Sequence, residues 1–183
     1  MRTGRGPRSL APGRTVSPVA NVFRGGALDL DLSNGGTEVF VEVMMLALSA
    51  LAGDEWDFRF AALIARQDQY VMGRGAAGFD LEDVDWGSTP TERARAREFV
   101  LRTIDLALAR HRWEDLGYEA PFAAEHLWRF RRMVEAFDPV GVVPAPGAFP
   151  ARDEVVVAFC LRHRVLAPLR WYSACVLCGS RAA

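Results

Sequence analysis

Hydrophobic positions recur every three or four residues along four stretches of the chain, the spacing that gathers them on one face of an α-helix. The first predicted helix covers residues 37–52, and the second runs from 54 to about 70. The third covers residues 89–111, and the fourth covers residues 121–137. The pattern predicts a mainly α-helical fold of about four packed helices.

Local signals mark the ends of these helices. Gly53 follows the first helix, and Asp54 is placed to cap the second. The third begins with a capping box, in which the Thr89 side chain accepts from the backbone of Glu92 and the Glu92 side chain reaches back. Pro90 falls at the first helical position, where its missing N–H costs nothing.

Two segments have the pattern of β-strands. Residues 27–32 alternate leucine with aspartate, which predicts a short N-terminal strand with one wet face. Residues 154–159 are rich in valine and lead directly into Cys160. Residues 165–172 then supply a return segment, so a small C-terminal β-hairpin is expected.

The residues that carry chemistry gather near the C-terminus. Cys160-Leu-Arg-His163 is followed, after eleven residues, by Cys175-Val-Leu-Cys178, and the chain has no other cysteine. A two-residue gap lets both side chains of a pair turn toward one ion, so the two pairs together supply four ligands. Thiolate and imidazole donors favour zinc over magnesium or calcium. The alternative is a set of incidental or buried cysteines beside a solvent-facing histidine.

Four protein ligands leave no open position for water or substrate, so we expect a structural Zn²⁺ rather than a catalytic one. Metal binding would also supply folding energy to a segment too short to fold around its own core. The sequence therefore predicts a zinc-ribbon or knuckle-like β-hairpin at the C-terminus.

Composition divides the chain into four predicted parts. Residues 1–26 hold five arginines and no acid, and we interpret them as a disordered basic tail. A start codon placed too far upstream would look the same, so whether this tail is native stays open. Residues 27–138 form the helical body, and the four prolines and two glycines of 139–150 indicate a semi-rigid linker. Residues 151–183 form the small zinc-binding module.

Charge and hydropathy narrow the possible partners. The net charge of −1 provides no global field that would attract nucleic acid or a membrane. All 22 basic residues are arginine, which indicates the codon bias of a high-GC bacterial genome more than a local function. No apolar stretch reaches the roughly 18–20 residues that span a bilayer, and the N-terminus lacks a secretory signal. We therefore expect a cytoplasmic protein, with reduced thiols and no membrane partner.

Other signals have simpler explanations. Residues 73–78, Gly-Arg-Gly-Ala-Ala-Gly, match the dinucleotide fingerprint, but no strand precedes them and acids follow, so a flexible turn is expected. The acidic stretch 79–86 lacks EF-hand spacing. Its apolar residues are expected to anchor a loop, and its acids would form at most a patch for a basic partner. His111 and His126 have no second histidine at metal spacing.

Basic and aromatic residues interleave around the metal motif. They are Arg162, Arg164, Arg170, Trp171, Tyr172 and Arg181. Such a set can track a nucleic-acid backbone and stack on bases. The favoured interpretation is that the two aromatic rings pack the metal-binding segment onto the helical body, because the net charge is nearly neutral.

The leading hypothesis is a small soluble bacterial zinc-binding protein without enzymatic activity. It would act as an accessory or immunity-type protein whose partner is another protein. One alternative is a nucleic-acid-binding regulator that uses the zinc module. Another is a small biosynthetic enzyme with a site between helices, using His126 or His111.

Overall fold

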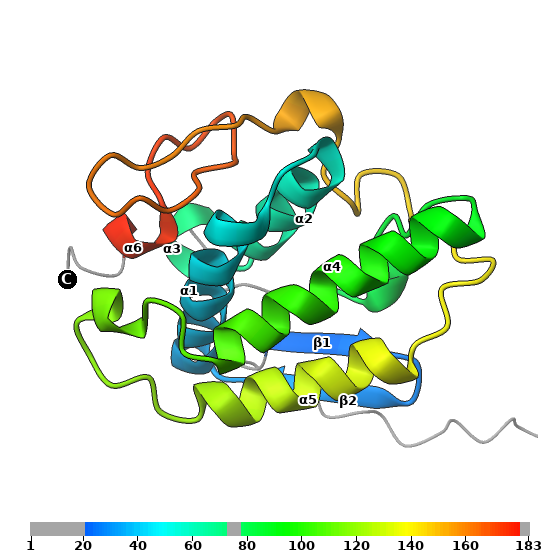
Figure 1. The fold of residues 1–183 in the computed structure, drawn as a ribbon, viewed down its shortest axis with the longest axis horizontal. Helices are drawn as coiled ribbons and strands as arrows, with labels where there is room; N and C mark the ends of the chain where they lie inside the picture. Colours follow the sequence, from blue (N-terminus) through cyan, green and yellow to red (C-terminus); the bar gives the residue numbers. More distant parts are fainter. Residues whose placement is uncertain (1–20, 73–77, 180–183) are drawn as a thin grey trace, which may run out of the picture.

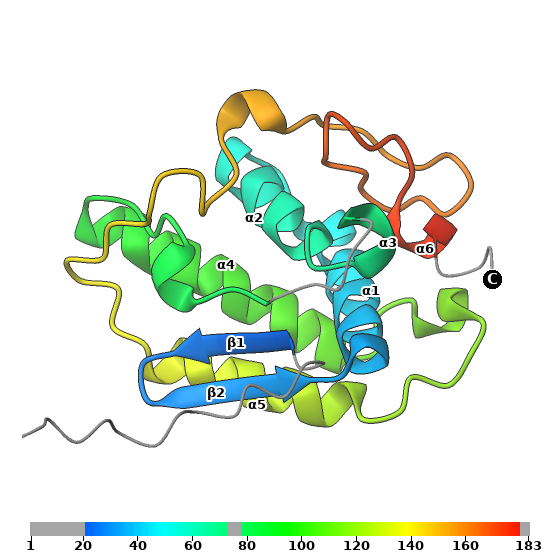
Figure 2. The same cartoon turned by 180° about the vertical axis from the view of Figure 1, so that it is seen from behind.

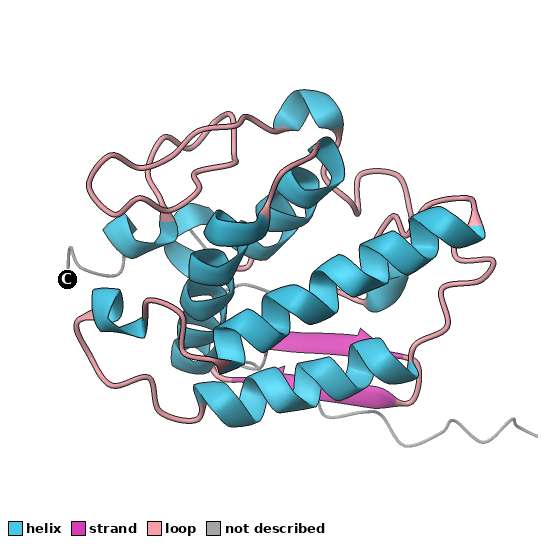
Figure 3. Ribbon diagram, viewed as in Figure 1, coloured by secondary structure: helices cyan, strands magenta, loops and turns pink. Residues whose placement is uncertain are grey.

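The computed structural model describes residues 21–72 and 78–179 of the chain (Figure 1). Its strands are β1 (Asn21–Gly25) and β2 (Leu28–Leu32). Its helices are α1 (Asn34–Leu51), α2 (Glu55–Ala65), α3 (Gln69–Met72), α4 (Pro90–Leu108), α5 (Ala123–Ala136) and α6 (Val176–Gly179). Short 3-10 turns are η1 (Leu81–Asp83), η2 (Trp113–Leu116) and η3 (Arg152–Glu154). Helices dominate (Figure 3), which confirms the mainly helical fold with four main helices.

The two predicted helix caps are confirmed, whereas α1 begins at Asn34, three residues before the predicted start, with Ser33 as its cap. Asp54 caps α2 and exchanges hydrogen bonds with Asp57. At the start of α4, the Glu92 N–H donates to Thr89 Oγ1 at 3.2 Å and the Thr89 N–H donates to Glu92 at 2.8 Å. α4 ends at Leu108, earlier than expected, and the chain then turns sharply because Arg110 and Arg112 both adopt left-handed backbone, each with φ of 59°.

The N-terminal strand is part of an antiparallel hairpin. β2 matches the predicted strand, and β1 pairs with it in the register Phe23↔Leu30. β1 lies within the stretch assigned to the basic tail, so the folded region reaches back to Asn21; residues 1–20 lie outside the described part. Gly26 takes a φ of 61° in the two-residue turn between the strands.

Helix α5 covers one face of this hairpin. α5 contacts both strands and α4, and α4 also packs against α1. Seen from behind, the hairpin lies in front of α5 (Figure 2). Four phenylalanines, Phe23, Phe40, Phe79 and Phe130, meet between these elements with ring centroids 5.2–6.2 Å apart. This aromatic cluster ties the hairpin, α1 and α5 into one core.

The acidic stretch 79–86 is anchored as predicted. Its apolar side chains Phe79, Leu81, Val84 and Trp86 are all buried. Asp80 forms an ion pair with Arg24, and Asp85 forms one with Arg59. These intramolecular pairs weaken the case for an acidic patch that faces a basic partner.

Of the predicted glycine-rich turn, only Gly78 falls within the described residues. Its φ is 78°, and a Cβ placed there would lie 2.0 Å from the Val22 carbonyl oxygen. Close packing of the backbone against β1 therefore requires glycine at this position. Residues 73–77 lie outside the described part of the chain.

Residues 139–150 connect α5 to the C-terminal segment without a helix or strand. Phe149 is buried against Trp56, with ring centroids 5.8 Å apart, and the Arg59 guanidinium lies 4.5 Å from its ring centroid. Buried residues on both sides of this connection, Phe60 and Leu166 among them, belong to one hydrophobic core. The division of the chain into separate domains stays a prediction.

The C-terminal segment crosses α2 and α1 at the end of the molecule opposite the β1–β2 hairpin (Figures 1 and 2). Regular strands were expected here, but the segment pairs only through isolated antiparallel bridges, Val155↔Leu169 and Phe159↔Leu166. Between these bridges the outer strand advances four residues, from 155 to 159, while the inner strand advances three, from 166 to 169, so the outer strand bulges by one residue. Pro168 also has no N–H to donate. The zinc-ribbon classification is therefore not confirmed, although a Cys/His cluster exists here.

No helix among the described residues combines the length and apolar character needed to cross a membrane.

Candidate metal centre

The first ligand pair lies in the turn that joins the outer strand to the inner one. The Cys160 N–H donates to the Val165 carbonyl at 2.8 Å, and the Arg164 N–H donates to the Cys160 carbonyl at 2.8 Å. Arg164 closes the turn in left-handed backbone, with a φ of 54°. This tight turn carries Cys160 and His163 to the same side of the hairpin end.

The second ligand pair lies at the short helix α6. Cys175 immediately precedes α6 and Cys178 lies within it, and the Cys178 N–H donates to the Cys175 carbonyl at 2.9 Å. Between them, Val176 and Leu177 are buried in the core. The apolar residues of the motif thus fix the helical turn that presents both sulfurs in one direction.

The four donor atoms all lie within 4.8 Å of one another. The Sγ atoms of Cys160, Cys175 and Cys178 are separated by 3.7 Å from 160 to 178 and by 3.7 Å from 175 to 178. His163 Nδ1 lies 3.7, 3.2 and 3.4 Å from the sulfurs of Cys160, Cys175 and Cys178. Zinc bonds of about 2.3 Å to sulfur and about 2.0 Å to nitrogen would give tetrahedral edges of about 3.8 and 3.5 Å. The arrangement therefore fits one tetrahedral ion, and the predicted residues form the predicted cluster.

Burial and hydrogen bonding act differently on the thiols. Burial raises the pKa of the Cys175 thiol well above its ordinary range. Burial also raises the pKa of Cys160, but backbone N–H groups of His163 and Arg162 point at its sulfur, and the pKa ends below its ordinary value. A thiol as buried as Cys175 becomes a thiolate most readily when a cation compensates its charge. The donor set thus suits a resident metal ion better than reactive free thiols.

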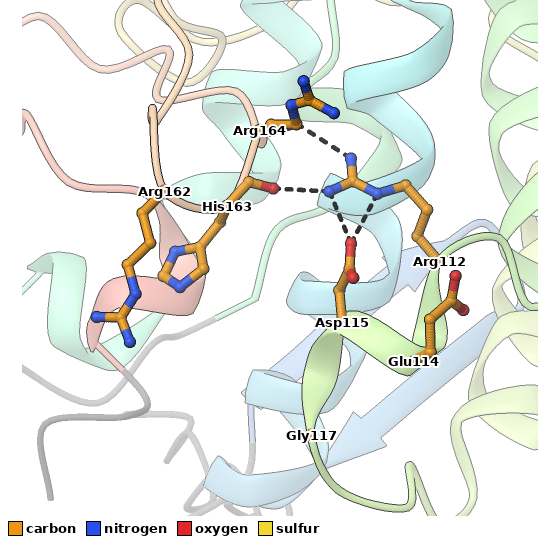
Figure 4. Close-up of a pocket in the computed structure, with 7 residues that line it drawn as sticks. All are labelled: Arg112, Glu114, Asp115, Gly117, Arg162, His163 and Arg164. Atoms are coloured by element: carbon orange, nitrogen blue, oxygen red, sulfur yellow. Dashed lines mark hydrogen bonds and ion pairs between the residues drawn. The ribbon is translucent and has the colours of Figure 1, made fainter.

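Arg112 fastens the first ligand pair to the helical body (Figure 4). Its guanidinium donates to the carbonyl oxygens of His163 at 2.6 Å and Arg164 at 3.1 Å. Asp115 holds the same guanidinium through contacts of 2.8 and 2.7 Å. The sequence analysis missed this contact, because 51 residues separate Arg112 from His163 and no local pattern joins them.

A surface pocket of about 780 Å³ lies beside this contact, lined by Arg112, Glu114, Asp115, Gly117, Arg162, His163 and Arg164. The side chains of Arg162 and Arg164 extend to different sides of His163 (Figure 4). The Arg112 guanidinium already serves two carbonyls and a carboxylate. The pocket therefore does not gather three free guanidinium groups around one anion.

The remaining histidines lie away from any recognisable catalytic set. His126 is half-buried on α5, its ring near that of Phe122 and close to Gly36 at the start of α1. Burial lowers the pKa of His126 below its ordinary value. His111 lies in the turns after α4. Within the described ranges, the grouping of histidine, cysteine or acidic side chains that could hold a metal is the Cys160 cluster, and neither histidine belongs to it.

Tyr172 approaches the metal centre from the loop before α6. Burial raises its pKa, with further contributions from the nearby Asp68 and the thiols of Cys178 and Cys175. Trp171 is 54 % exposed, so of the two aromatic rings only that of Tyr172 packs inward as expected.

Comparison with protein families, with curated proteins and with solved structures finds no match to this chain. The functional argument therefore depends on the geometry of the chain itself.

Proposed function

We propose that this chain is a non-enzymatic binding protein that carries one structural zinc ion and whose partner is another protein. The observation that supports it most directly is the near-tetrahedral set of three sulfurs and one imidazole nitrogen. Such a set fills the coordination of zinc with protein ligands, as structural sites do. The proposal places the protein in the cytoplasm, where the thiols stay reduced.

Exposed apolar side chains support the protein-binding part of the proposal. Several of them lie in the C-terminal segment that the ligands hold: Val157, Phe159, Leu161 and Trp171. Clusters of exposed apolar side chains are typical of interaction surfaces. Zinc would thus keep in place the part of the molecule that a partner contacts.

Elemental analysis of the purified full chain tests the metal. We expect about one zinc per chain, released when the thiols are modified, as the ligand count of a structural site implies. Cys175→Ser should lose the zinc, while Ser173→Ala, an exposed neighbour, should keep it. A chain without zinc, or a Cys175→Ser variant that retains it fully, would contradict the proposal.

Co-expression tests the partner. The immunity-type version predicts a stable complex with the product of an adjacent gene, separated by size exclusion and weakened by chelation or by Trp171→Lys. The failure of every neighbouring gene product to form a complex would remove that version.

A second candidate function is single-stranded nucleic-acid binding. It is favoured by Arg162 and Arg164, which are exposed and form no ion pair with a described residue. We expect retention on polythymidine at about 50 mM salt that falls steeply as salt rises. Changing both arginines to glutamine should abolish this retention, and a chain that is never retained would exclude the function.

A further inference from the structure

The outer strand of the C-terminal hairpin has an open edge. Residues 155–161, Val-Val-Val-Ala-Phe-Cys-Leu, contain no charge and no proline. On the inner side, the Val156 N–H donates to the Pro168 carbonyl and the Ala158 carbonyl accepts from Ala167, both at 2.9 Å. On the other side, no described residue pairs with the backbone N–H or C=O of Val157 or Phe159. Edge strands of this composition are templates for the addition of another strand.

The side chains along this edge are exposed and apolar. Val157 is 66 % exposed, Phe159 48 % and Leu161 98 %, whereas Leu166 and Leu169 on the inner strand are buried. Val156, Ala158 and Cys160, which alternate with them, are only partly exposed. Val157 and Phe159 therefore share the open face, and Leu161 continues this stripe in the turn that follows. A strand that paired with the edge would cover this stripe with its own alternate side chains.

Charge distinguishes among the possible occupants. The edge begins after Asp153 and Glu154 and ends before Arg162, with Arg164 beyond. Asp153, Arg162 and Arg164 make no ion pair within the described part of the chain. At the same start, Arg152 is held by Glu55 at 3.1 Å and Glu154 by Arg66 at 2.7 Å, which leaves Asp153 as the acid that a second copy can meet. An antiparallel second copy would bring the acidic start of one strand opposite the basic end of the other.

We propose that two copies of this chain pair through these edges, antiparallel and about a twofold axis. Val157 of each copy lies opposite Phe159 of the other, and each such pair exchanges the backbone hydrogen bonds that both residues leave open. Beyond this extended stretch, the turn at 161–163 of one copy faces the η3 turn (Arg152–Glu154) of the other, which brings Arg162 near Asp153. A self-complementary patch is what a twofold interface requires. The dimer needs neither a partner protein nor a nucleic acid, but it covers Val157 and Phe159, which the proposed function assigns to a partner protein. A partner protein would therefore compete with the second copy for this edge, and the mass of the purified chain alone tests the dimer separately from the proposed function.

Sedimentation equilibrium of the full chain, with its metal content measured, tests the dimer. We expect twice the chain mass of 20.2 kDa. A dimer with a dissociation constant of about 1 μM would be almost fully formed at about 100 μM chain. Val157→Lys should weaken the dimer by more than tenfold, because it places like charges across the axis. Val143→Lys, at a valine 86 % exposed outside the hairpin, is the matched control and should stay dimeric. A wild-type chain at single-chain mass would leave the edge to another kind of strand or ligand and would overturn the proposal, as would a dimer indifferent to Val157→Lys.

A charge exchange tests the register and keeps the apolar stripe intact. Arg162→Glu should weaken the dimer, and adding Asp153→Arg to the same chain should restore it, since the turn that holds Arg162 lies near the η3 turn that holds Asp153 of the other copy. If Val157→Lys loses its metal or melts at a lower temperature than wild type, its effect on the dimer is not specific. The two charge variants then test the dimer in its place. A double variant no tighter than Arg162→Glu alone would remove the antiparallel register.

Discussion

Arg112 donates a hydrogen bond of 2.6 Å to the main-chain carbonyl of His163. Arg112 immediately precedes the η2 turn of the helical body, and His163 is the imidazole donor of the candidate metal centre. Asp115 holds the same guanidinium in place. The helical body and the metal centre are thus joined by a charge-assisted contact that the ligands themselves do not provide.

Removing this contact should loosen the metal without removing a ligand. We expect Arg112→Met to destabilise the fold by about 1–3 kcal/mol, because two carbonyls and one carboxylate lose a charged donor. Zinc transfer to a chromogenic chelator should become faster. Arg132→Met, at an exposed residue of α5, is the control and should transfer zinc at the wild-type rate. Equal rates in both variants would show that Arg112 does not support the site.

Chelation should act on one end of the molecule. All four donors lie after residue 159, and the amide of Cys160 is protected by a hydrogen bond to Val165. On zinc removal we expect faster hydrogen exchange at Cys160 and Arg164, because metal binding stabilises the turn that protects them. Amides within α4 should change little. Equal acceleration in α4 would mean that the metal stabilises the whole fold.

The inner strand should matter more to stability than the turn beside it. Leu166 is fully buried, and its N–H donates to Ser49 Oγ at 2.9 Å. Leu166→Ala should cost about 2–5 kcal/mol of unfolding free energy through the cavity it leaves. Leu161→Ala removes the same atoms from a side chain that is 98 % exposed. In denaturant titrations, we expect Leu161→Ala to unfold near the wild-type midpoint; similar losses in the two variants would contradict the packing described.

Glu38 on α1 should make stability depend on pH. Burial raises its pKa, and the neighbouring carboxylates of Glu42 and Asp68 raise it further. A carboxyl whose pKa is raised by folding stabilises the fold while protonated, and this contribution is lost as pH rises above 4.5, the ordinary value, and through the folded pKa. Glu38→Gln should therefore melt above wild type at about pH 7.

The difference in melting temperature between Glu38→Gln and wild type should shrink as the pH approaches 4.5. Melting curves over this range, with the metal content held constant, measure it. A variant less stable than wild type at neutral pH would show that the Glu38 charge is favourable in the fold.

Local patterns determined much of this protein. The main helices follow from apolar spacing, and the Thr89–Glu92 and Asp54–Asp57 caps form as expected because each joins residues three apart. The metal-binding residues were also readable, since Cys160 and His163, like Cys175 and Cys178, can meet within one turn of chain. The sequence could not decide how the strand before Cys160 pairs. A regular β-hairpin was expected there, but the segment pairs only through isolated bridges.

Tertiary structure decided what depends on residues distant in sequence. β1 was not predicted, because its short pattern acquires meaning only when Phe23 meets Phe40 and Phe130 in the core. The contact of Arg112 with His163 spans 51 residues and leaves no local signal. The exposure of Val157 and Phe159 likewise depends on which of the two C-terminal strands packs against the helices. A run of apolar residues has the same sequence pattern in a buried strand and in an edge strand. Local chemistry therefore set the helices and the ligands, and long-range packing decided which surfaces remain for a partner.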